Sequence, residues 1–187
     1  MTPADAALLV RYRRMLSTLQ VRAAAGLAAA WDVLATVDAD DVDRYRAATA
    51  PLVLATRQAT ANTAASLYAT LLRTELTPID ALAVPVPDKL RAPFTATWHA
   101  LAQGRPYEEA RIVGRSVAQA TGDDLVTSTA RRSGDQYTAA TGQQITWTRE
   151  PSQGACDWCM ERAGGEYSTA EAADYGHERC SCLVVPI

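Results

Sequence analysis

The chain has 187 residues and a formal net charge of −3, from 18 lysine and arginine residues against 21 aspartate and glutamate residues. This length suits one domain, or one domain with a small module. The near balance of charge excludes the strongly basic overall surface that is typical of general nucleic-acid binders. No apolar run approaches the roughly 20 residues that a membrane-spanning helix needs, so we expect no membrane association.

Residues 1–76 are predicted to form a hairpin of two long helices. Apolar residues recur every three or four positions from Leu8 to Leu34, which is the spacing of one helix face. The acidic residues from Asp38 to Asp41 predict a turn and the start of a second helix, which should run to about Leu76. Pro51 lies within that helix and should kink or split it. An extended hairpin of this kind offers surface to an assembly rather than enclosing a substrate.

Residues 77–142 are predicted to form a proline-rich linker and a helical region. Three prolines between positions 77 and 87 favour an extended linker. A helical pattern then covers residues 88–103. Residues 106–140 read as two further helices, because Gly122 should end the first of them and the two aspartates after it should begin the second.

Four arginines in this region, at positions 111, 115, 131 and 132, have two interpretations. They could form a basic face that binds phosphates, or a solvated surface paired with Glu108, Glu109, Asp123 and Asp124. The mixture of signs favours the surface of ion pairs, since phosphate binding needs a concentrated positive patch.

Residues 143–187 are predicted to form a small β-rich module. Apolar and polar residues alternate between Gln143 and Arg149, as in a half-buried strand, and the apolar stretch from Cys182 to Ile187 predicts another strand. The module has too little apolar core to fold without a staple. The fold class predicted for the whole chain is therefore mainly α: a long N-terminal helical hairpin and further helices, followed by a small β-rich C-terminal module of zinc-knuckle type.

All four cysteines lie in the last 32 residues, beside a histidine, in the pattern C-x2-C-x17-H-x2-C-x-C. A structural zinc ion takes four nitrogen or sulfur ligands, usually from two short chelating pairs separated by a loop. This spacing predicts such a zinc site but leaves open which four of five residues bind. The candidate ligands are Cys156, Cys159, His177, Cys180 and Cys182.

Two other interpretations of the cysteines stay open: disulfide bonds, with His177 uninvolved, and unmodified thiols. Arg11, Arg13 and Arg14 interrupt the only early apolar stretch, so we expect no secretory signal. Thiols stay reduced in the cytosol, which favours metal binding over disulfides. A catalytic zinc is less favoured than a structural one, because it needs an open position, and neither H-E-x-x-H nor a deaminase signature is present.

The C-terminal motifs resemble the end of Mu F-like minor capsid proteins, the head morphogenesis proteins of tailed bacteriophages, and are most similar to those of actinobacterial phages. The resemblance rests on four stretches: Trp147-Thr-Arg149, Cys156-Asp-Trp-Cys159, Tyr167-Ser-Thr-Ala-Glu-Ala, and His177 through Pro186. It is specific over about 40 residues and looser over the N-terminal helices.

The resemblance implies a structural, non-enzymatic protein inside the phage head near the portal, assembled in the host cytoplasm. Its expected partners are the portal protein and the inner capsid shell or scaffold, with several copies in each virion. Packaged DNA is a further expected contact, since some members are delivered with the DNA.

Two other function classes remain as alternatives. A zinc-knuckle nucleic-acid binder would have basic and aromatic residues around its ligands, whereas the neighbours here include Asp157, Glu161, Glu166 and Glu178. A zinc-dependent nuclease or toxin-like enzyme would need a general base and an open metal position. The nearest histidine, His177, is already a candidate ligand, so we expect no enzymatic activity.

Overall fold

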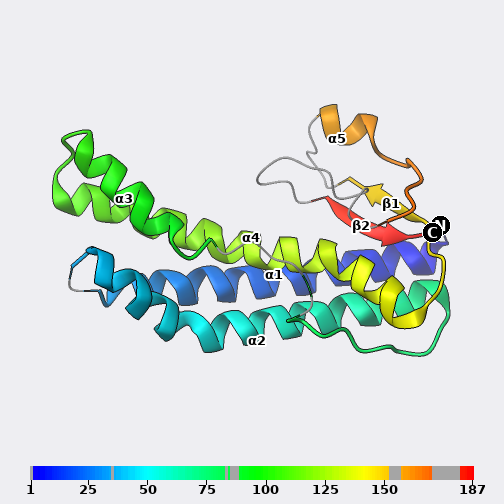
Figure 1. Ribbon diagram of the computed structural model, residues 1–187. Helices are drawn as coiled ribbons and strands as arrows, with labels where there is room; N and C mark the ends of the chain where they lie inside the picture. Colours follow the sequence, from blue (N-terminus) through cyan, green and yellow to red (C-terminus); the bar gives the residue numbers. More distant parts are fainter. Residues whose placement is uncertain (1, 35, 83, 85–88, 152–156, 170–181) are drawn as a thin grey trace.

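The computed structural model describes residues 2–34, 36–82, 84, 89–151, 157–169 and 182–187 (Figure 1). These residues are mainly helical, as predicted. The elements in chain order are α1 (Pro3–Asp32), α2 (Ala39–Leu72), α3 (Ala92–Ala102), α4 (Tyr107–Thr141), β1 (Trp147–Glu150), α5 (Asp157–Glu161) and β2 (Leu183–Pro186). β1 and β2 pair antiparallel as a two-stranded sheet, with Trp147 opposite Pro186 and Glu150 opposite Leu183.

The first two helices begin at reciprocal capping boxes. The Thr2 hydroxyl accepts a hydrogen bond from the Asp5 backbone N–H at 3.2 Å, and the Asp5 carboxylate accepts one from the Thr2 N–H at 2.8 Å. Asp38 and Asp41 repeat the arrangement at the start of α2. Each box satisfies N–H groups that have no partner within the helix, so both starts are set by neighbouring residues.

The second helix is continuous through Pro51, so the predicted split does not occur. Pro51 and Ala47 both lie on the exposed side of α2. Water can therefore reach the Ala47 carbonyl, whose helical donor the proline removes. The helix ends at Leu72 rather than Leu76, because Arg73 adopts the left-handed conformation with φ of 54°.

The fourth helix runs unbroken for 35 residues, so the predicted break at Gly122 is wrong. Gly122 is buried within α4. A Cβ atom placed there would lie 2.4 Å from the Ala24 backbone nitrogen and 2.6 Å from the Ala23 carbonyl carbon. The residue is glycine because α4 and α1 cross there at backbone distance, and the helix ends instead at Gly142, whose φ is 66°.

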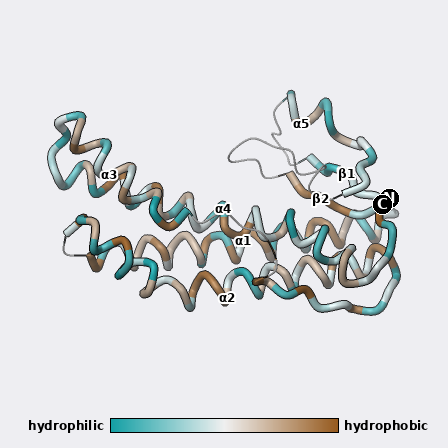
Figure 2. The backbone as a smooth tube through the Cα atoms, viewed as in Figure 1, coloured by the Kyte–Doolittle hydropathy of each residue, from teal (hydrophilic) through white to brown (hydrophobic). Residues whose placement is uncertain are grey.

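Three long helices, α1, α2 and α4, lie side by side and form an elongated bundle, with α3 packed on the early part of α4 (Figure 1). Figure 2 shows hydrophobic and hydrophilic residues interspersed along all three helices. Many of the buried positions are alanines, which allows close helix packing. The predicted hairpin of α1 and α2 is therefore completed by α4.

Aromatic residues fill both ends of the bundle. Trp31, Tyr45 and Phe94 meet edge to face at one end, with ring centroids 4.9 to 6.1 Å apart. At the other end Tyr68 packs against Tyr137 at 5.5 Å and against Trp147 at 5.1 Å. The Tyr68 hydroxyl also donates a hydrogen bond to the Ala130 carbonyl, which joins α2 to α4.

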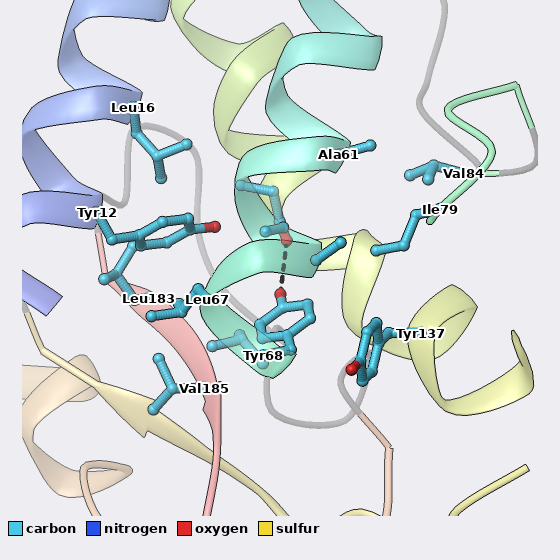
Figure 3. Packing of buried hydrophobic residues seen from close by; sticks show 14 of the residues in the cluster. Tyr12, Leu16, Ala61, Leu67, Tyr68, Ile79, Val84, Tyr137, Leu183 and Val185 are labelled. Carbon is cyan, nitrogen blue, oxygen red and sulfur yellow. Dashed lines mark hydrogen bonds between the residues drawn. The ribbon is translucent and has the colours of Figure 1, made fainter. Parts of the chain in front are cut away.

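The two strands cover this second end of the bundle. Leu183 and Val185 of β2 lie in the same buried cluster as Tyr12, Leu67 and Tyr68 (Figure 3). Strand β1 starts at Trp147, later than predicted, and Trp147 is fully buried. The β-rich module therefore shares its apolar core with the helices.

Candidate functional site

Two of the five candidate metal ligands lie among the described residues. Cys159 lies in α5, and Cys182 immediately precedes β2. Their exposed fractions are 1% and 2%, and both belong to one small buried cluster with Trp158. The fold thus brings together two cysteines from the two halves of the predicted ligand pattern.

The other three candidates, Cys156, His177 and Cys180, lie outside the described residues. In the part of the chain that the structure describes, no group of three His, Cys, Asp or Glu residues could hold a metal ion. The described part supplies two sulfur donors at one buried place. Such a donor pair fits zinc, which accepts thiolate ligands in closed structural sites.

The ring of Trp158 is flanked by two arginines. The guanidinium carbon of Arg162 lies 4.0 Å from the ring centroid, and that of Arg149 lies 5.3 Å from it. Arg149 is 1% exposed, whereas Arg162 is partly exposed. Cations over an indole face are attracted by its quadrupole, more strongly where water is excluded.

Sequence reasoning did not find Arg149 as part of this site. The sequence placed Arg149 in an alternating strand and in one of the stretches that resemble Mu F-like proteins, but neither signal says that its guanidinium is buried beside Trp158. The contact of Arg149 with Trp158 of α5 joins two separate elements, which the local pattern cannot reveal.

Arginines of helices α1 and α4 donate hydrogen bonds to the backbone of the C-terminal module. The Arg131 guanidinium donates a hydrogen bond to the Cys182 carbonyl at 3.4 Å, and that of Arg13 donates one to the Pro151 carbonyl at 3.1 Å. Arg13 also lies 3.9 Å from the Glu150 carboxylate. Both contacts anchor the ends of segments that lead to the candidate ligands.

Two of the four α4 arginines considered in the sequence analysis, Arg115 and Arg131, make different kinds of contact. Arg115 pairs with Asp32 of α1 at 2.9 Å, and Asp124, one of the expected partners, pairs instead with Lys89. Arg131 binds the C-terminal module. Ion pairing of Arg115 agrees with the predicted surface, although its partner lies on a different helix from the one expected.

A second feature is an apolar groove of about 470 Å³ on the side of the bundle. Its apolar lining is Leu27, Ala50, Val53, Leu54, Leu82, Leu90 and Leu125. Leu54 and Leu82 are 47% and 68% exposed. Arg46, Arg57 and Lys89 add cationic groups to the lining, against one carboxylate from Asp124.

This groove offers a surface for a partner, because large leucine side chains are exposed around a hollow. None of the described helices is long and apolar enough to cross a membrane.

In a comparison with family models, the chain matches the family described as VG15 protein over residues 3–187. The match covers all the elements described above. Comparison with curated proteins and comparison with solved structures give no significant match.

Proposed function

The chain belongs to the VG15 family, which is phage-related, and we propose that it is a structural minor capsid protein of a tailed bacteriophage, of the Mu F-like head morphogenesis type. The observation that carries the proposal is the family match over nearly the whole chain. The finer assignment is supported by the resemblance of the C-terminal motifs to Mu F-like proteins. In this proposal the protein acts inside the head near the portal, without enzymatic activity, and in several copies per virion.

The elongated bundle supports a docking role. Its three long helices have 30, 34 and 35 residues, so each spans about 45–53 Å at 1.5 Å per residue. The groove lined by Leu54 and Leu82 lies on this bundle, and its lining includes neither Cys159 nor Cys182. We assign to it an apolar segment of the portal or inner shell protein, with acidic residues facing the cationic part of the lining.

The C-terminal module is proposed to be stapled by structural zinc. Four of Cys156, Cys159, His177, Cys180 and Cys182 would hold the ion, and the burial of Cys159 beside Cys182 supports the thiolate part of the set. The two strands already pack in the core that they share with the helices, so bound zinc would supply folding free energy mainly to the part of the module around Cys159 and Cys182. Metal analysis of purified protein, with Cys159→Ser as the variant, tests this part.

Quantitative mass spectrometry of purified virions and of empty proheads tests the assignment. A few copies per portal ring in both particles are expected for a built-in minor capsid component. Absence from mature particles alone would indicate an assembly factor. Absence from both particles would contradict the proposal and favour the nucleic-acid or enzyme alternatives.

Point variants test the docking surface. Leu54→Glu and Leu82→Glu replace exposed side chains, so the fold should survive while co-purification with the portal protein falls. Val33→Glu is the matched control, because Val33 is 79% exposed but does not line the groove. Equal portal recovery with all three variants would show that the groove is not the contact.

A further inference from the structure

The segment that follows α2 packs closely on the bundle at its described residues. Ile79, Ala81 and Val84 are at most 2% exposed and belong to the main buried cluster of the bundle. Leu82 lies between them in sequence, but it is 68% exposed and lines the apolar groove. One large apolar side chain is therefore exposed on a stretch that is otherwise held in the core.

Hydrogen bonds fix the turn that carries Leu82. The Arg57 guanidinium of α2 donates to the carbonyls of Ala81 and Val84 through one terminal nitrogen, at 2.5 and 2.6 Å. The Asp80 carboxylate accepts a hydrogen bond from the Leu82 backbone N–H at 2.9 Å. The two carbonyls belong to residues on either side of Leu82, so Arg57 brackets the position of the exposed leucine.

A fixed position for an exposed leucine does not itself stabilise the fold, because the hydrophobic effect rewards burial. It does favour binding, since a contact residue that is already ordered loses less conformational freedom when a partner docks. Hydrogen bonds from a charged donor are also stronger than those between neutral groups. The turn at Leu82 therefore has the properties of a contact that is formed before the partner arrives.

Arg57 also lines the groove, so it could meet an acidic residue of the partner directly or act through Leu82. Its two hydrogen bonds both lead to the segment that carries Leu82, which favours the second role. We propose that Arg57 is a positioning residue of the groove, which holds Leu82 as a pre-formed contact for the apolar segment of the partner. The inference rests on the docking role proposed above and deepens it, because it assigns a polar residue to the presentation of an apolar contact.

The test is a double-mutant cycle on the full-length chain, read out as affinity for the purified portal protein and, separately, for the inner shell protein. We expect Arg57→Gln to weaken binding to the partner by about 10-fold. In a Leu82→Ala background the same substitution should have little further effect, because its route to the partner is gone. Arg57→Lys keeps the charge and the donors, so it should bind more tightly than Arg57→Gln.

Arg22→Gln is the matched control for the loss of one positive charge. Arg22 is exposed on α1 and does not belong to the lining of the groove, so this variant should bind like the wild type. Hydrogen exchange of residues 79–82 gives a readout that needs no partner. Exchange should be faster in Arg57→Gln than in the wild type, while far-UV circular dichroism shows an intact bundle. If Arg57→Gln does not fold, Asp80→Ala takes its place in the cycle, since it releases the other hydrogen bond of the turn.

Three results would overturn the inference. Unchanged hydrogen exchange in Arg57→Gln would show that Arg57 does not hold the turn. Equal weakening of binding in the wild-type and Leu82→Ala backgrounds would show that Arg57 meets the partner directly. Wild-type affinity of Arg57→Gln would show that the position of Leu82 does not matter for docking. A wild-type chain that binds neither protein would overturn the docking role itself, whereas the capsid assignment is decided separately by the protein content of virions.

Discussion

Replacing Gly122 with alanine tests whether the missing side chain at this position sets the distance between α1 and α4. Helix propensity alone predicts that the substitution raises the free energy of unfolding, since alanine is more favourable than glycine in a helix interior by about 1 kcal/mol. The tertiary structure predicts instead that the substitution lowers the free energy of unfolding. The new methyl carbon would lie 2.4 Å from a backbone nitrogen of α1, and ordinary contact begins near 3.4 Å.

The methyl group therefore falls about 1 Å inside van der Waals distance of a rigid neighbour. Overpacking typically costs about 1–3 kcal/mol, and the upper end applies here because backbone atoms cannot rotate away. After the helix gain is subtracted, we expect a net loss of about 2 kcal/mol. For a chain of this size that corresponds to a fall in Tm of about 4–8 °C.

Urea unfolding followed by far-UV circular dichroism measures the free energy of unfolding. Gly26→Ala is the matched control, because the nearest atom to its new Cβ is the end of the Leu52 side chain, 2.5 Å away, which can move. The control should keep wild-type stability or gain up to about 1 kcal/mol. A Gly122→Ala protein as stable as its control would refute the reasoning.

Three further predictions concern the helices. Tyr68→Phe should lower the free energy of unfolding by about 1–2 kcal/mol in urea titrations, because it removes the buried bond to the Ala130 carbonyl, and unchanged stability would contradict that role. Pro51→Ala should raise stability by about 1–3 kcal/mol in the same assay, since it restores the missing hydrogen bond of α2, whereas a loss would show that the proline is favourable in place. The hydrogen bond from the Thr36 hydroxyl, helped by the Asp38 N–H and by Arg44, holds the pKa of Asp41 below its ordinary value. The stabilisation by the Asp41 carboxylate is present above the pKa of Asp41 in the unfolded chain and is lost as pH falls through its lower pKa in the folded protein. The free energy of unfolding that Asp41→Asn loses relative to the wild type should therefore shrink below about pH 4 when the urea titration is repeated at several pH values. A loss that is independent of pH would contradict this reasoning.

The candidate site was only partly predictable. The cysteine spacing placed Cys159 and Cys182 among five candidate ligands of one site, and the structure buries these two in one cluster. The sequence did not indicate that Arg149 contacts Trp158, because an alternating strand has the same pattern whether or not another element covers it. Cys156, His177 and Cys180 lie outside the described residues, so their part in the site stays a prediction.

The sequence by itself determined the mainly helical class and the starts of α1 and α2, because capping boxes act over three residues and need no distant partner. Only the tertiary structure decided the role of Gly122, which reads as a helix end and serves as the crossing point of α4 and α1. It also decided that α4 completes the hairpin as a three-helix bundle, and that the strands share its core. These features depend on contacts between residues about 100 positions apart, whereas local signals extend over only a turn or two of helix.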